Sequence, residues 1–173
     1  MTDLVRAAAA TAHSRLFIGA RPSLAVTSAL SQVAEALARR AASANIDASW
    51  VPPPAYHLSI GYLGWVRDEL ISAMVAEIAP VVEPVGEVKV ARLFGAPSTA
   101  AAQVIAAGIG AGSDRIMSVR DRVAAVLAKL GVAPAAPPVP PHITLGRRNV
   151  AGGIEDVILP YAEQAFSGWG IDS

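Results

Sequence analysis

The chain repeats one arrangement twice, and this repeat limits the folds that it can adopt. In each half, a segment with helical hydrophobic spacing is followed by a proline-rich connector and then by a short strand that opens with histidine. Residues 57–60 read HLSI and residues 142–145 read HITL. These two copies of a His-x-Ser/Thr-x motif predict a duplicated α+β module whose halves are related by a pseudo-twofold axis.

The motif places its polar side chains together because residues i and i+2 of a β-strand project from the same face. His57 therefore shares a face with Ser59, and His142 shares a face with Thr144. The apolar residues that alternate with them would lie under helices. If the two halves pair about the pseudo-twofold axis, both imidazole and hydroxyl pairs come into one cleft.

Hydrophobic periodicity predicts the remaining elements of an α+β fold with two lobes, antiparallel sheets around a central cleft and helices on the outside. Strands are expected at residues 16–20, 56–63, 87–93, 103–107 and 142–145, and helices at about 24–44, 70–81 and 116–130. We expect the first strand to be buried and the second to end at Gly64. Ser23 and Ser113 are the expected helix caps, and residues 50–54 the expected extended connector.

The composition excludes several classes of protein. The chain of 173 residues has no cysteine and equal numbers of basic and acidic side chains, 14 of each. Disulfide scaffolds, thiolate zinc sites and cysteine nucleophiles are therefore excluded. Binding to duplex DNA needs a basic surface that displaces counterions, so a chain without net charge is a poor candidate for it. No stretch approaches the roughly 20 apolar residues of a membrane span.

These observations predict a cytoplasmic, monomeric protein that is not attached to a membrane. Residues 1–14 are expected to form an alanine-rich extension rather than a signal peptide. Residues 15–173 are expected to form one domain, since this length suits a single core. We expect its substrate to be small, or to be only the end of a larger molecule.

Four segments resemble the bacterial RNA 2′,3′-cyclic phosphodiesterases, also called 2′-5′ RNA ligases, of the two-histidine (2H) phosphoesterases. They are RLFI at 15–18, WVPP at 50–53, HLSIGYLG at 57–64 and PHITLGR at 141–147. The resemblance implies a bilobal α+β fold and metal-independent cleavage of a cyclic phosphodiester at an RNA terminus or on a small nucleotide. It also implies that His57 is the general acid and His142 the general base.

The residue types suit this chemistry. Opening a cyclic phosphodiester needs a base that takes a proton from water and an acid that protonates the departing alkoxide, and imidazole serves both roles near neutral pH. The hydroxyls of Ser59 and Thr144 can donate to the non-bridging phosphate oxygens, whose charge grows in the transition state. No metal or cofactor is required by this scheme.

Other candidate residues carry a weaker signal. Arg147 is a candidate phosphate ligand, although a regular strand would turn it to the face opposite Thr144 unless a bend at Gly146 redirects it. An aromatic side chain could stack on a base, but at most one of Tyr56 and Tyr62 can share the face of His57. The other aromatic candidates are Trp65 and Phe94, and packing in the core or at a sheet edge is the expected use of all four.

Three alternative functions remain open at this stage. A nucleotide-binding module could keep the fold without turnover, although both histidines and both hydroxyls are intact. A phosphodiesterase or ligase could act on 2′,5′ linkages with the same residues. The third alternative is a metal protein with histidine ligands. Two histidines without a nearby carboxylate do not complete the ligand set of a metal ion, which counts against it.

Overall fold

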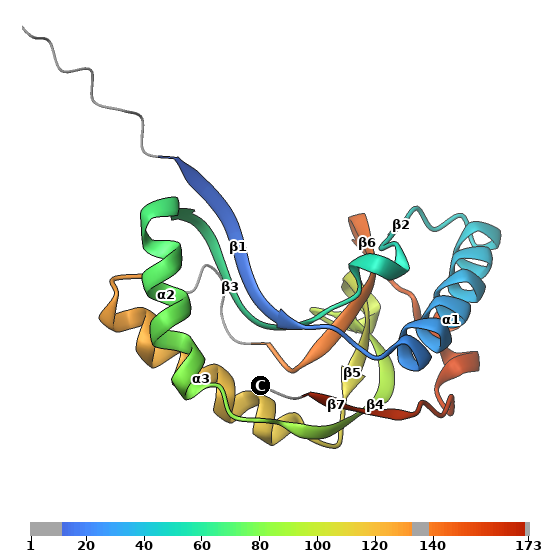
Figure 1. Ribbon diagram of the computed structural model, residues 1–173. Helices are drawn as coiled ribbons and strands as arrows, with labels where there is room; N and C mark the ends of the chain where they lie inside the picture. The colour runs from blue at the N-terminus through green and yellow to red at the C-terminus, as the bar shows by residue number, and fades with distance from the viewer. Residues whose placement is uncertain (1–11, 133–138, 172–173) are drawn as a thin grey trace, which may run out of the picture.

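The computed structural model describes residues 12–132 and 139–171, which form a mixed α+β structure (Figure 1). The strands are β1 (His13–Ala20), β2 (Ser49–Trp50), β3 (Leu58–Arg67), β4 (Gly86–Ala96), β5 (Ala102–Ile109), β6 (His142–Gly152) and β7 (Gly168–Ile171). The α-helices are α1 (Leu24–Ser43), α2 (Ile71–Ile78), α3 (Ser113–Lys129) and α4 (Glu155–Ile158). The predicted α+β class is confirmed.

All seven of these strands belong to one antiparallel sheet with the order β1-β3-β6-β5-β4-β7, and β2 pairs with β6. The two motif strands, β3 and β6, are neighbours within it. They meet where Leu58 lies opposite Ile143, and both of these side chains are fully buried. The two halves are therefore joined through their motifs into one continuous sheet, where the sequence had suggested separate sheets.

The two long helices cover the sheet from outside, and each covers the motif strand of the other half of the chain. α3 packs on β3, and α1 packs on β6; Figure 1 shows α2 and α3 under the β1–β3 arm and α1 at the opposite end. The helix stripes read from the sequence are the buried faces of α1 and α3. Ser23 caps α1 as predicted, because its Oγ accepts the Val26 N–H at 3.3 Å.

The second predicted strand does not end at Gly64, and this expectation was wrong. Gly64 has a φ of +67°, which glycine adopts without strain. In the pairing with β1, Leu16 lies opposite Gly64 and Phe17 lies opposite Tyr62, so Leu63 is an extra residue on β3. A glycine at such a β-bulge bends a strand without ending it, and β3 therefore continues to Arg67.

Three further expectations were wrong. β1 was expected to be buried, but it is an end strand of the sheet and leaves Phe17 51% exposed. Ser113 was expected to cap α3, but it is the first helical residue and Gly112, with φ +82°, holds the cap position. The expected connector at 50–54 contains the end of β2 and most of a 3₁₀ turn, η1 (Pro53–Ala55).

The terminal and connecting segments are described only in part. β1 begins at His13, so His13 and Ser14, which were assigned to the extension, pair with Arg67 and Val66 of β3. Residues 1–11 of the alanine-rich extension and most of the second proline-rich connector, residues 133–138, lie outside the described residues. Within the described part of the chain, no helix is both long and apolar enough to span a membrane.

Candidate active site

The two motif histidines are held by the same local contact. His57 lies two residues after the end of η1, and its Nδ1 lies 2.8 Å from the carbonyl oxygen of Ala55. Nδ1 of His142 lies 2.8 Å from the carbonyl oxygen of Pro140. A carbonyl oxygen only accepts hydrogen bonds, so Nδ1 is the donor in both rings. In the neutral form of each imidazole, Nε2 is therefore the nitrogen with the free lone pair.

The register of β3 and β6 places the four motif side chains on one face. Leu58 and Ile143 face each other and point into the core. The antiparallel register, continued by one residue to each side, sets His57 opposite Thr144 and Ser59 opposite His142. Ser59 is exposed, and the other three are partly exposed. The structure thus brings together the four residues that the sequence singled out.

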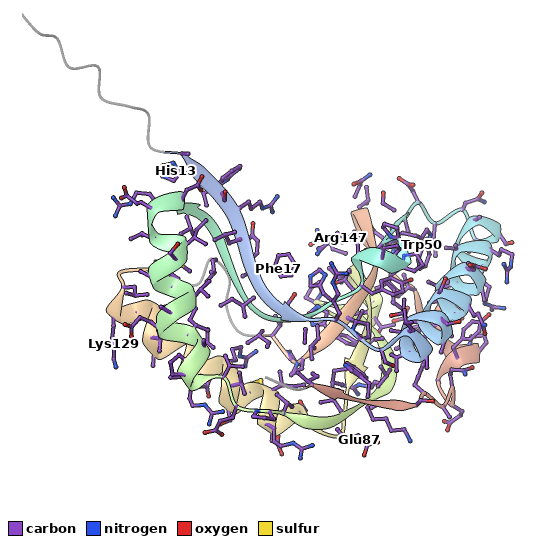
Figure 2. The ribbon with its side chains drawn as sticks, in the orientation of Figure 1. His13, Phe17, Trp50, Glu87, Lys129 and Arg147 are labelled. Atoms are coloured by element: carbon purple, nitrogen blue, oxygen red, sulfur yellow. The ribbon has the colours of Figure 1, made fainter. Side chains whose placement is uncertain are left out.

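A bulge in β6 decides the direction of Arg147. Ala106 of β5 lies opposite Thr144, but the next residue, Ile105, lies opposite Gly146, so Leu145 is extra. The following pair is Val104 with Arg147. Because Val104 and Ala106 are two apart on β5, Arg147 shares the face of Thr144. Figure 2 shows Arg147 and Phe17 on the same side of the sheet.

Two phenylalanines pack against the histidines, and sequence reasoning did not give them this position. The Phe17 ring lies 4.4 Å from the His57 ring at an angle of 34°. The Phe94 ring lies 5.9 Å from the His142 ring and meets it at 83°. Phe94 had been considered for base stacking or for packing in the core or at the sheet edge, and Phe17 only as part of a strand. No local sequence signal identifies such contacts, because they depend on how β1 and β4 are aligned in the sheet.

Glycines beside the histidines leave space for these rings. Gly108 lies opposite His142, and a Cβ atom there would be 3.1 Å from the Phe94 ring. Gly19 lies opposite Ser59, and a Cβ atom there would be 3.3 Å from the Phe17 ring and 2.8 Å from a backbone oxygen. Larger side chains at these two positions would displace the rings that contact the imidazoles.

The structure adds one cation and separates the candidate tyrosines. Arg92 lies opposite Gly108 and is exposed on the face of His142, which sequence reasoning missed. Tyr56 is buried in the core, and burial, followed by the nearby carboxylate of Glu35, raises its pKa. Tyr62 is on the histidine face and accepts a hydrogen bond from Nε of Arg15. As predicted, at most one of the two tyrosines faces the motif histidines.

Two other features of the described residues lie apart from this face. A pocket of about 350 Å³ is lined by residues of α1 and α4, among them Arg39, Arg40 and Asp156, and by none of the motif residues. In the part of the chain that the structure describes, no three His, Cys, Asp or Glu side chains are grouped as a metal ion would require.

Two solved structures that are similar over most of the chain identify the fold. TT0787 of Thermus thermophilus has a TM-score of 0.69 and 18% identity, covering 91% of this chain and 84% of that one. Escherichia coli LigT complexed with 3′-AMP has a TM-score of 0.61 and 16% identity, covering 92% and 84%. The chain has the 2H phosphoesterase fold.

More distant structures share this 2H phosphoesterase fold. Kluyveromyces marxianus Usb1 with uridine monophosphate has a TM-score of 0.50 and 12% identity, covering 94% of this chain and 99% of that one. No protein-family model and no curated protein matches the sequence. At these identities the likeness establishes the fold, and the activity has to be argued from the residues of this chain.

The packing of Phe94 over Gly108 gives a test on stability. Replacing Gly108 with alanine would place a Cβ atom 3.1 Å from the Phe94 ring, which would have to shift by a few tenths of an ångström. We expect overpacking of this kind to cost about 1–3 kcal/mol of unfolding free energy. Gly61 of β3 has no atom within 4 Å of its Cβ position, so Gly61→Ala is the matched control. Urea unfolding measures both. Equal stability of the two variants would show that Gly108 is not needed for this packing.

Proposed function

We propose that this protein hydrolyses 2′,3′-cyclic phosphodiesters at RNA ends or on small nucleotides, without a metal. The observation that carries the proposal is the pair of imidazoles on one sheet face, each with Nδ1 bound to a backbone carbonyl and Nε2 left for chemistry. Two proton carriers and two hydroxyls around one position suit in-line displacement at a phosphorus atom.

The proposed reaction balances its protons between the two rings. Neutral Nε2 of His142 takes a proton from water while the water oxygen bonds to phosphorus. The bond from phosphorus to one ribose oxygen breaks, and Nε2–H of protonated His57 gives its proton to that oxygen. The resemblance alone assigns the order of the two roles. The product is a phosphate monoester, and proton exchange with solvent restores both rings.

The surrounding side chains support the developing charge. Ser59 and Thr144 are the proposed donors to the non-bridging oxygens, and preorganised donors of this kind stabilise a transition state more than a ground state. Arg147 adds a positive charge on the same face because the bulge at Leu145 turns it there. Arg92 is a further cation on the face of His142, two strands away, with Gly108 between the two residues.

The ligands of the similar structures agree with this proposal. E. coli LigT was solved with 3′-AMP, and K. marxianus Usb1 with uridine monophosphate. Both are ribonucleotides that carry one phosphate, which is the kind of molecule that the proposed reaction releases. The intact set of two imidazoles and two hydroxyls favours turnover over a module that only binds nucleotides.

The first test removes each imidazole. His57→Ala and His142→Ala should each lower kcat/KM on a 2′,3′-cyclic nucleotide by at least about 10²-fold, because each ring carries one proton transfer. His13→Ala is the control on the third histidine of the chain. All assays contain EDTA, and circular dichroism confirms folding. Near-normal rates in either motif variant, or complete loss of wild-type activity in EDTA, would contradict the proposal.

The second test separates the hydroxyls from the histidines. Ser59→Ala and Thr144→Val should slow turnover by about 10–10³-fold, as expected for losing a donor to a developing charge. Valine keeps the branched shape of Thr144 on its strand, so a slower rate cannot be assigned to lost packing. The dependence of kcat/KM on pH should have the same shape in both variants as in the wild-type protein, because the substitutions leave both imidazoles in place. An unchanged rate in both variants would show that the hydroxyls do not contact the phosphate.

A further inference from the structure

Aromatic and basic side chains continue along the β1–β3 ladder beyond the motif histidines. Directly opposed residues of an antiparallel pair project from the same face, and three successive pairs carry such side chains. They are Phe17 with Tyr62, Arg15 with Trp65, and His13 with Arg67. We call Arg15, Phe17, Tyr62, Trp65 and Arg67 the β1–β3 track.

The track begins at the candidate active site and leads away from it. Its inner end is Phe17, whose ring contacts His57, and two residues further along β1 Gly19 lies opposite Ser59. At about 3.3 Å per residue, the part of β3 from Ser59 to Arg67 spans roughly 20 Å once its bulges are allowed for. Figure 2 shows His13 and Phe17 far apart along β1, which marks this extent.

The track is exposed and positively charged. Trp65 is 73% exposed and Phe17 51%. No Asp or Glu occurs in β1 or β3, although the chain as a whole is neutral. Arg67 pairs with Glu69 across 2.5 Å, but both side chains are more than half exposed, and exposed ion pairs of this kind contribute little. A phosphate can therefore replace this carboxylate.

Contacts within the track hold one of its cations in place. The Arg15 guanidinium lies 5.3 Å from the centre of the Tyr62 ring and donates from Nε to the Tyr62 hydroxyl. Arg15 is also opposite Trp65. A fixed cation next to an exposed indole matches a ligand in which flat rings alternate with negative charges.

Single-stranded nucleic acid has this alternation of bases and phosphates, whereas a duplex hides the faces of its bases. We infer that the β1–β3 track binds the single-stranded RNA segment next to the reacting end, with a base stacked on Trp65 and phosphates contacting Arg15 and Arg67. This inference rests on the proposed function. It makes an oligonucleotide end, rather than a free nucleotide, the preferred substrate.

The experiment compares two substrates that share the same reacting group. One is a 2′,3′-cyclic mononucleotide, and the other is an unpaired oligoribonucleotide of about eight nucleotides with the same cyclic end. Wild-type protein should have a lower KM for the oligonucleotide. Trp65→Ala should raise that KM about 5–160-fold, since a base stacked on an aromatic ring adds about 1–3 kcal/mol. The mononucleotide KM should change much less, and Trp65→Phe should retain most of the affinity.

A binding measurement separates this inference from the proposed function. The ligand is the same oligonucleotide with a 3′-phosphate, and its Kd is followed by fluorescence anisotropy over a range of salt concentrations. Arg15→Gln should weaken binding and reduce the salt slope by about 0.7, the value for one phosphate contact on a single strand. Leu159→Ala and Arg39→Gln are matched exposed controls on other elements, and they should leave the Kd unchanged.

The possible outcomes distinguish the two proposals. If Trp65→Ala weakens oligonucleotide binding but no cyclic phosphate is hydrolysed, RNA binding by the β1–β3 track is supported and the proposed hydrolysis is contradicted. If the mononucleotide is hydrolysed but Trp65→Ala leaves the oligonucleotide KM and Kd unchanged, the hydrolysis stands and the track is overturned. Equal competition by inorganic polyphosphate, which has no bases, would also overturn the track, because it would show a charged surface without stacking.

Discussion

The pairing of Leu58 with Ile143 is the contact on which the candidate site depends. It joins the β1–β3 pair to the rest of the sheet and buries both side chains completely. Because strand side chains alternate between faces, fixing these two residues in the core fixes their neighbours on the opposite face. A slip of one residue would turn the imidazoles and hydroxyls into the core, where unpaired polar groups are costly.

The pairing of β3 with β6 also brings the two halves of the chain into contact through their helices. Each half supplies a helix that covers the motif strand of the other half, so neither motif strand has its core face buried by its own half alone. The two Nδ1 atoms take equivalent backbone carbonyls, yet the aromatic contacts differ: Phe17 lies tilted against His57, and Phe94 meets His142 edge-on. The two rings therefore share one tautomer but differ in their aromatic neighbours, which suits the separate acid and base roles that we propose for them.

The sequence predicted what depends on local periodicity. The apolar stripes of α1 and α3, the motif strands and the shared face of His57 and Ser59 all follow from spacings of two or of three to four residues. Bulges were not predictable, because an extra residue on one strand is defined only against its partner. The bulges at Leu63 and Leu145 carry β3 past Gly64 and turn Arg147 toward Thr144. The contact of Phe17 with His57 likewise required the alignment of β1 on β3.

The central claim is that Nε2 of His57 and Nε2 of His142 are both free and share one bound phosphate. Nitrogen-15 NMR of the three histidines tests it directly, with a titration of a ribonucleotide monophosphate at about pH 8, where imidazole is largely neutral. The structure predicts the Nδ1–H tautomer for both motif rings, and it predicts that both Nε2 signals shift with a single Kd while His13 does not respond. An Nε2–H tautomer in either ring, or a response from only one of them, would contradict the account.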